Sequence, residues 1–258
     1  MKYHIDTIPV WDALKLDSEC PLCALRRKTE LGEAERYLGA SVMEPDTRIQ
    51  VNKLGFCPQH HAMLFGMSNR LGHALMLESH TAETRQRIRK TCDDLNKAAK
   101  AWAEAPLGKM SRAGRGASER LDQVTAEMTK EVSSCIMCDS IHENMERYLH
   151  TFFHLYQNDT EFRKRFSQSK GVCLPHLADL VRTGREELSP KEFAPFCELL
   201  TSLTNSNLDR IQEDVSWFIK KFDYRYSAEP WKNSQDAVPR TVNKLRGWCV
   251  GDEPNPKE

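Results

Sequence analysis

Eight cysteine and histidine residues fall into four short motifs whose residue types and spacing suit a metal ion. Thiolate and imidazole are the ligands that Zn²⁺ prefers, and structural zinc sites are usually closed by four protein ligands. A C-x-x-C turn directs two sulfurs at one ion, and a C-x-x-H pair adds a third sulfur and a nitrogen. We therefore expect two Cys₃His sites that hold two zinc ions per chain. The predicted ligands are Cys20, Cys23, Cys57, His60, Cys135, Cys138, Cys173 and His176.

The two kinds of motif occur in the same order twice. C-x-x-C at 20–23 is followed by G-F-C-x-x-H at 55–60, and C-x-x-C at 135–138 is followed by G-V-C-x-x-H at 171–176. The insert between the two cysteine motifs is 33 residues in the first half and 34 in the second. Self-similarity at a fixed offset is typical of a repeat architecture. We therefore expect an internal duplication in which each half closes its own metal site.

A second histidine competes for the fourth place in the first site, because His61 follows His60 directly. The second copy has His176 at the position that matches His60, and Leu177 at the position that matches His61. The repeat therefore predicts that His60 is the ligand.

The N-terminal segment 1–20 lacks the apolar stretch of a secretory signal, and no run of about 18 apolar residues predicts a membrane span. We therefore expect a cytoplasmic protein without a membrane span. Its nine cysteines then indicate metal or redox chemistry, because reducing compartments disfavour structural disulfides. An iron–sulfur cluster is the alternative to zinc, since cysteine thiolates are its usual ligands. A thioredoxin-like use of C-x-x-C would require strands beside it, and the sequence shows little strand pattern.

Long segments without proline predict a mainly α fold, a helical bundle built from the duplication with hairpin-like knuckles around the metals. We expect helices over 24–38 and 190–223, and one long or two stacked helices over 58–104. Residues 44–56 contain Pro45 and Gly55 and are expected to form a loop.

Composition divides the chain further. Residues 105–118 are rich in proline, glycine and serine, which predicts a flexible linker loop. The expected segments are a first metal-binding repeat over 1–104, the linker over 105–118, a second metal-binding repeat over 119–226, and a mostly irregular C-terminal tail over 227–258 with one short helix near 239–246.

Charge gives little indication of a partner. The net charge is zero, so nothing attracts the whole chain to nucleic acid or to an anionic membrane. Residues 84–120 are basic, with ten Lys or Arg against four Asp or Glu, and could contact phosphates. A solvated helix face is the commoner meaning of such a stretch, so nucleic acid remains an alternative partner. The aromatic-rich segment 217–240 either packs on the helices or forms a recognition surface.

The chain resembles an uncharacterised family of cytoplasmic bacterial proteins, found mostly in anaerobes. The resemblance rests on HIDTIPVWDAL, CPLCALRRK, GFCPQHHAML with NRLGHALML, and KFDYRYSAEPWKNSQDAVPR. It covers nearly the whole chain and implies a single unit, but it implies no reaction.

Three functions remain open from the residues. The first is a metal-binding protein, without catalysis, whose two structural zinc sites brace a helical scaffold that binds a partner. The second is an iron–sulfur redox or metal-handling protein. The third is a nucleic-acid-binding adaptor that uses the stretch 84–120. No phosphate loop, serine-type triad or paired-carboxylate site is recognisable, which weighs against an enzyme and assigns no catalytic residue.

Overall fold

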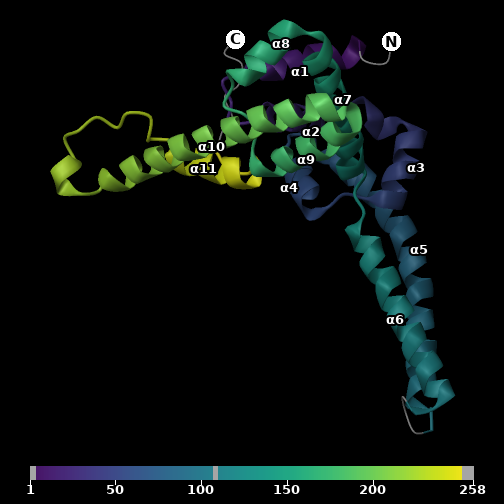
Figure 1. Ribbon diagram of the computed structural model, residues 1–258. Helices are drawn as coiled ribbons and strands as arrows, with labels where there is room; N and C mark the ends of the chain where they lie inside the picture. Colours follow the sequence, from purple (N-terminus) through teal and green to yellow (C-terminus); the bar gives the residue numbers. More distant parts are fainter. Residues whose placement is uncertain (1–3, 107–109, 252–258) are drawn as a thin grey trace. The chain divides into compact units, whose positions relative to one another are not determined.

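The computed structural model describes residues 4–106 and 110–251, and within these ranges it contains helices and no strand. Figure 1 shows the course of the chain. The mainly α fold class is therefore confirmed. Hairpin-like knuckles are not found in the described ranges, because each metal-binding motif lies at the start of a helix.

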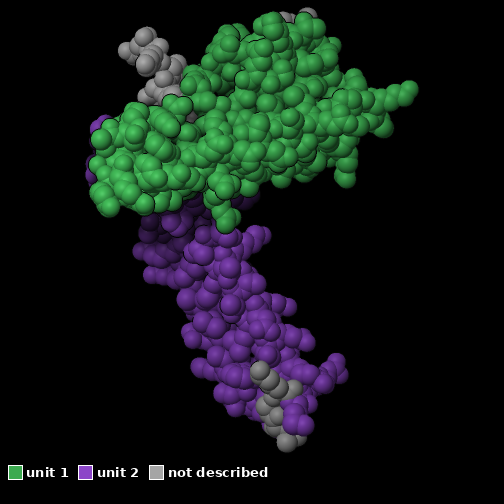
Figure 2. All heavy atoms as spheres, turned by 60° about the vertical axis from the view of Figure 1, so that its left-hand side comes forward, with its two compact units in different colours: residues 1–29, 143–258 green, residues 30–142 purple. Residues whose placement is uncertain are grey.

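The chain divides into two compact units that do not coincide with the two halves of the sequence. Unit 1 consists of residues 1–29 and 143–258, and unit 2 consists of residues 30–142 (Figure 2). The boundaries fall within α2 (Pro21–Leu38) and α7 (Ile136–Asn158), so both helices contribute residues to both units.

Unit 1 is built around an aromatic core. Phe152 and Phe153 of α7 pack against Phe162 and Phe166 of α8 (Thr160–Ser167) and against Phe196 of α10 (Pro190–Lys220), in edge-to-face pairs. Such pairs stabilise a core beyond the area that they bury. The other helices that lie wholly in this unit are α1 (His4–Lys15), α9 (Leu174–Glu187) and α11 (Ala237–Arg246), with the short 3₁₀ helix η3 (Tyr224–Tyr226).

The long helix expected over 190–223 is α10. Its start follows from the sequence, because Pro190 occupies the first turn and Ser189 with Glu192 forms a capping box. The short helix expected in the C-terminal tail is α11. Residues 221–236 between them fold onto α10, where the indole N–H of Trp217 donates to the carbonyl oxygen of Pro230 and the ring of Phe218 contacts that of Trp231. Within the segment, the Nζ atom of Lys221 donates to the carbonyl oxygens of Tyr226, Ser227 and Glu229.

Unit 2 contains a small core and a long helical hairpin. Tyr37, Val51, Leu64 and Met76 are among the buried residues of the core. The hairpin consists of α5 (Arg70–Ala103) and α6 (Arg112–Ser133), which run side by side as a long pair (Figure 1). The other elements that lie wholly in this unit are η1 (Ala40–Met43), α3 (Pro45–Leu54) and α4 (Pro58–Gly66).

Three details of unit 2 differ from expectation or refine it. The loop predicted over 44–56 is wrong, because Pro45 starts helix α3, which ends at Gly55 with φ 61°. The region 58–104 forms two helices, and Asn69 caps the second by accepting a hydrogen bond from the Gly72 N–H group. Helix α6 begins at Arg112, inside the stretch expected to be a linker, since Ser111 caps it. Residues 107–109 of that stretch lie outside the described ranges.

None of the helices in residues 4–106 and 110–251 combines the length and the apolar character needed to cross a bilayer.

Candidate metal centres

The eight predicted ligands lie in two groups of four, and each group brings its ligand atoms within 4.8 Å of one another. Site 1 lies in unit 1 and consists of Cys20, Cys23, Cys173 and His176. Site 2 lies in unit 2 and consists of Cys57, His60, Cys135 and Cys138.

The expected pairing within each half of the sequence is wrong. In site 1 the C-x-x-C motif of the first half meets the C-x-x-H motif of the second half. In site 2 the C-x-x-H motif of the first half meets the C-x-x-C motif of the second. The two halves therefore exchange motifs, and neither half contains all four ligands of one site.

Each motif begins a helix. Cys20 and Cys135 directly precede α2 and α7, and Cys57 and Cys173 are the N-cap residues of α4 and α9. A helix N-terminus carries partial positive charge, which stabilises a nearby anion. Two helix starts therefore converge on each site, where three thiolates, a neutral histidine and a divalent ion would leave one net negative charge.

The backbone before the C-x-x-H motifs is alike in the two halves. Gly55 and Gly171 have positive φ angles of 61° and 69°, which glycine adopts at little cost. Cys57 and Cys173 have nearly the same φ and ψ angles, −72° and 165° against −72° and 162°. Proline follows in the first turn of both helices, at the first position of α4 (Pro58) and at the second position of α9 (Pro175), so similar local sequences produce the same turn twice.

The distances in site 1 suit a single tetrahedral ion. With Zn–S distances of about 2.3 Å and Zn–N of about 2.0 Å, neighbouring sulfurs lie about 3.8 Å apart and a sulfur and a nitrogen about 3.5 Å apart. The Sγ atoms of Cys23 and Cys173 are 3.6 Å apart. The Nδ1 atom of His176 lies 3.4 Å from the Sγ atoms of Cys20 and Cys23, and 3.2 Å from that of Cys173.

Site 2 has the same dimensions. The Sγ atoms of Cys57 and Cys138 are 3.8 Å apart. The Nδ1 atom of His60 lies 3.3 Å, 3.2 Å and 3.5 Å from the sulfurs of Cys57, Cys135 and Cys138. In both sites Nδ1 is therefore the nitrogen that faces the thiols.

The second ring nitrogen of His60 meets a buried carboxylate. Its Nε2 atom lies 3.3 Å from Oε1 of Glu30, to which Gln59 also donates a hydrogen bond. A carboxylate at this position orients a metal-binding histidine and fixes its tautomer. Sequence reasoning did not identify Glu30, because no spacing relates an acidic residue in the middle of α2 to the motif at 57–60.

The side chain of Lys244 joins the two segments that lead into site 1. Its Nζ atom donates to the carbonyl oxygens of Glu19 and Lys170, which lie shortly before Cys20 and Cys173. Lys244 is 1% exposed, and burial lowers the pKa of its amine. The residue Trp248, four positions later, donates its backbone N–H to Sγ of Cys23. Neither residue was predicted to contact a site, since both lie in the C-terminal tail, where no metal-binding motif occurs.

In site 2 the histidine and the thiols shift the pKa values of one another. The hydrogen bond with Cys135, together with that to Glu30, raises the pKa of His60 to about 10. Burial alone would raise the pKa of Cys135, but the hydrogen bonds with His60, Cys138 and Cys57 together outweigh it and lower this pKa to about 6. Burial and the neighbouring Cys135 raise the pKa of Cys138 to about 12.

Site 1 behaves similarly. Burial opposes protonation of His176, yet Cys173 and Cys20 raise the pKa of this histidine to about 10. Burial would also raise the pKa of Cys20, and contacts with Cys173, Cys23 and His176 bring it well below its usual range. In each site a thiol of lowered pKa therefore lies beside a histidine of raised pKa, and the neighbouring thiols Cys138 and Cys23 have raised pKa values.

His61 lies outside both groups. Its Nδ1 atom is 3.2 Å from Nε2 of His73, and the two rings are stacked. The geometry thus groups His60, and not its neighbour, with the three thiols.

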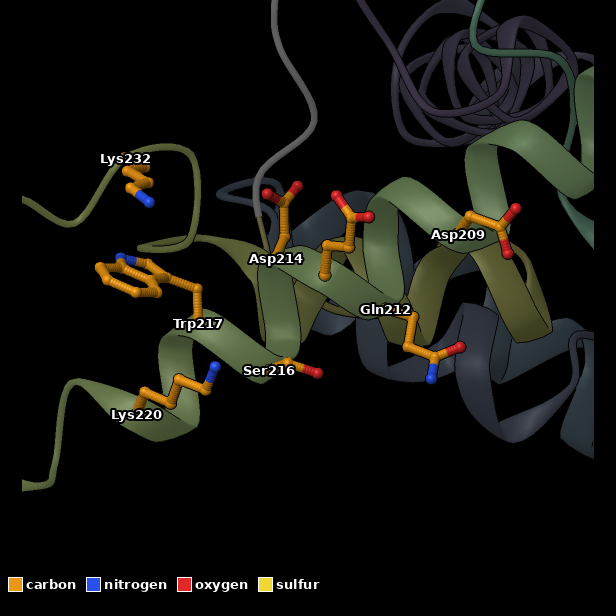
Figure 3. Close-up of a pocket in the computed structure, with 8 residues that line it drawn as sticks. Asp209, Gln212, Asp214, Ser216, Trp217, Lys220 and Lys232 are labelled. Atoms are coloured by element: carbon orange, nitrogen blue, oxygen red, sulfur yellow. The ribbon is translucent and has the colours of Figure 1, made fainter.

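A groove of about 610 Å³ lies along α10, beside the folded-back segment 221–236 (Figure 3). The Nζ atom of Lys232 lies 3.9 Å from the centre of the Trp217 ring, whose indole N–H donates to the carbonyl oxygen of Pro230. The lining mixes acids and bases, so no single ligand charge is favoured. Its residues are Asp209, Gln212, Glu213, Asp214, Ser216, Trp217, Lys220 and Lys232.

The model of a family described as "Family of unknown function (DUF6062)" matches residues 1–252, and the chain belongs to this family. No curated protein and no solved structure is significantly similar to the chain.

Proposed function

We propose that this member of the DUF6062 family is a zinc protein in which two Cys₃His sites fasten together helices that are distant in the sequence. The observation that carries the proposal is the crossed pairing. Residues 150 or more positions apart, such as Cys23 and Cys173, meet at distances that suit one tetrahedral ion. A metal at such a place closes a long loop and stabilises the fold that presents its ligands.

Zinc accounts for the distances better than a cluster does. The ligand atoms of each group lie within 4.8 Å of one another, which leaves room for one ion. An iron–sulfur cluster contains several irons and sulfides between its thiolates, and it would hold them farther apart. Three thiolates and one imidazole are also a usual ligand set for structural zinc.

A structural role accounts for the ligand number better than a catalytic one. A catalytic zinc usually has three protein ligands and an open position for water or substrate, whereas each of these groups supplies four. The function that we propose is therefore a braced helical scaffold, whose partner would be a protein. Some of the charges of the stretch 84–120 form ion pairs within the α5–α6 hairpin, where Arg87 pairs with Glu131 and Arg120 with Asp94.

We also propose that the chain arose by duplication. The matching backbone angles at Cys57 and Cys173, and the helix that starts at each of the four motifs, support this origin. A duplicated pair of helical hairpins that exchange ligands would produce the observed crossing.

Elemental analysis of protein purified without oxygen and without added chelator tests the proposal. We expect two zinc ions per chain, a colourless protein, and zinc–sulfur and zinc–nitrogen distances in X-ray absorption spectra. A Cys92→Ser and Cys249→Ser double variant is the control, because both thiols are exposed and stand outside the two groups. Fewer than one metal ion per chain, or a visible absorption band that bleaches on reduction, would contradict the proposal.

A structural role has its own test. Removal of the ions with a chelator should lower the unfolding temperature and the helical signal in circular dichroism, because binding free energy contributes to folding. An apo-protein that keeps its full helical signal and the same unfolding temperature would overturn the structural role, while leaving metal binding in place.

A further inference from the structure

The two sites differ in how far solvent reaches their sulfurs. In site 1, Cys20 and Cys173 are 2% and 0% exposed, and Cys23 is also buried. In site 2, Cys135 is buried, but Cys57 is only partly buried and Cys138 is exposed. One edge of the second group of ligands therefore faces solvent.

Groups from outside the ligand set also contact site 1. The backbone N–H of Trp248 donates to Sγ of Cys23 at 3.3 Å, and Gly247 lies against the same sulfur. Hydrogen bonds to a thiolate stabilise its charge and hold it in place. The segment after α11 thus shields site 1, and it binds the least buried sulfur of that site directly.

The sulfur of Cys138 is held differently. Its contacts at hydrogen-bond distance are with Cys57 and His60, which are ligands of the same site. The other side of site 2 is fixed: His60 is 1% exposed and is buttressed by Glu30, and Cys135 is 3% exposed. If one ligand leaves, the remaining three can keep the ion in place.

We propose that site 2 is a metal-exchange site, where Cys138 gives up its place on the ion to a thiol-bearing donor or acceptor while site 1 retains its ion. This inference rests on the proposed metal binding. The step is a ligand substitution without a change of oxidation state. The bond between the ion and the sulfur of an entering thiolate forms, the bond to Cys138 breaks, and the released thiolate takes up the proton that the entering thiol has lost.

A thiol is the class of entering ligand that the site favours. Soft thiolate ligands compete for zinc better than carboxylates or water do. A small thiol or an exposed cysteine of a partner protein can approach Cys138 from solvent. Site 1 offers no exposed sulfur to such a ligand among its three cysteines.

The experiment follows release of zinc from the two-zinc protein to a chromogenic chelator, with and without glutathione. We expect one ion to leave in a phase that glutathione accelerates, and the other in a phase roughly 10-fold slower or more, since loss of outer contacts changes metal affinity by about 10- to 100-fold.

Brief treatment with N-ethylmaleimide followed by peptide mass spectrometry should show Cys138 labelled before Cys20, Cys23 or Cys173.

Variants with one intact site assign the two phases. Cys135→Ser should remove the fast phase, and Cys20→Ser should remove the slow phase. If either variant does not fold, the labelling order in the unmodified protein still decides the question. Equal release rates, release from site 1 first, labelling of a site 1 cysteine first, or a fast phase that does not depend on glutathione would overturn the exchange role. Protein that binds no zinc at the outset would instead overturn the proposed function.

Discussion

The Nδ1 atom of His176 lies 3.4 Å from the Sγ atom of Cys20, although 156 positions separate the two residues in the sequence. This contact joins the first C-x-x-C motif to the last C-x-x-H motif. A contact of such long range is costly to form in the unfolded chain, because closure of a long loop reduces its conformational entropy. A metal ion bound at the contact would offset that cost in the folded state.

The crossed pairing predicts which double variants lose one ion and which lose two. Cys20→Ser with Cys173→Ser alters a single site, so the protein should keep one zinc ion. Cys20→Ser with Cys57→Ser alters one ligand in each site, and this variant should keep none or bind both weakly. Zinc per chain, measured by mass spectrometry under native conditions, distinguishes the two cases.

Pairing within each half of the sequence predicts a different pattern. In that arrangement the variant with Cys20 and Cys57 replaced would keep one ion, and the variant with Cys20 and Cys173 replaced would keep none. The reverse of our expected pattern would therefore reject the crossed sites.

Residue types and spacing were sufficient to predict the eight residues that gather in the two groups, but not how the motifs pair. Local spacing determines which atoms within a motif can face one ion, because a C-x-x-C or C-x-x-H turn spans only four residues. The pairing depends on where the intervening helices carry the chain. Helix α2, with 18 residues, extends about 27 Å at about 1.5 Å per residue. The chain therefore travels that distance from the C-x-x-C motif at the start of α2 before it turns toward the C-x-x-H motif at 57–60.

Other features escaped prediction for reasons that can be named. Helix α3 was mistaken for a loop because Pro45 and Gly55 were taken as signs of irregular structure, whereas they mark its start and its end. Glu30 and Lys244 contact the sites or the segments before them from positions that tertiary packing alone determines.

Replacement of the two neighbouring histidines should have unequal effects. His60→Ala removes the nitrogen that faces three sulfurs and should release one of the two ions. His61→Ala removes a ring that contacts His73 and should leave both ions bound. Zinc stoichiometry of the two variants is the measurement, and loss of an ion only from the His61 variant would show that the repeat alignment was misleading.

Glu30→Gln should weaken site 2 without dismantling it. The carboxylate accepts from Nε2 of His60 when Nδ1 binds the ion, and its loss should lower the zinc affinity of site 2 by about 10- to 100-fold. Glu33→Gln is a matched control in the same helix, because Glu33 pairs with Arg36 instead. Competition with a chelator of known affinity measures the change. Equal affinities for the two variants would show that the contact with Glu30 has no part in metal binding.

An ion pair in the α5–α6 hairpin should make stability depend on pH. Hydrogen bonds from Arg87 lower the pKa of Glu131 below its ordinary value of 4.5. The pair therefore stabilises the folded state fully above that value, and its contribution is lost as the pH falls through the lower pKa of the folded state. Glu131→Gln should cost less than about 1 kcal/mol at neutral pH, as partly exposed ion pairs do.

The unfolding free energy measured at acidic pH tests the contribution of this ion pair. The difference in unfolding free energy between the original protein and Glu131→Gln should shrink on acidification and vanish below both pKa values. Glu119→Gln, an exposed position in the same helix, should show a smaller effect at neutral pH. A difference for Glu131→Gln that stays constant across the pH range would show that packing, and not charge, explains its cost.

Lys244→Met should weaken site 1 selectively. The amine donates to the carbonyl oxygens of Glu19 and Lys170, so it holds together the two segments that lead to Cys20 and Cys173. It also brings a positive charge to a buried group of thiols, and methionine keeps most of the volume while it removes both functions. We expect a loss of zinc affinity at site 1 of about 10- to 100-fold, the range for outer contacts of a metal site.

The readout for Lys244→Met must separate site 1 from general instability. The zinc affinity of site 2, measured in the same titration, should stay unchanged, because its ligands lie in the other compact unit. Lys191→Met is the matched control, since Lys191 is exposed near the start of α10. Parallel losses at both sites would indicate that the substitution acts through the stability of the whole chain. An unchanged site 1 would show that the ligands are held by their helices alone, without the bridge that Lys244 forms between them.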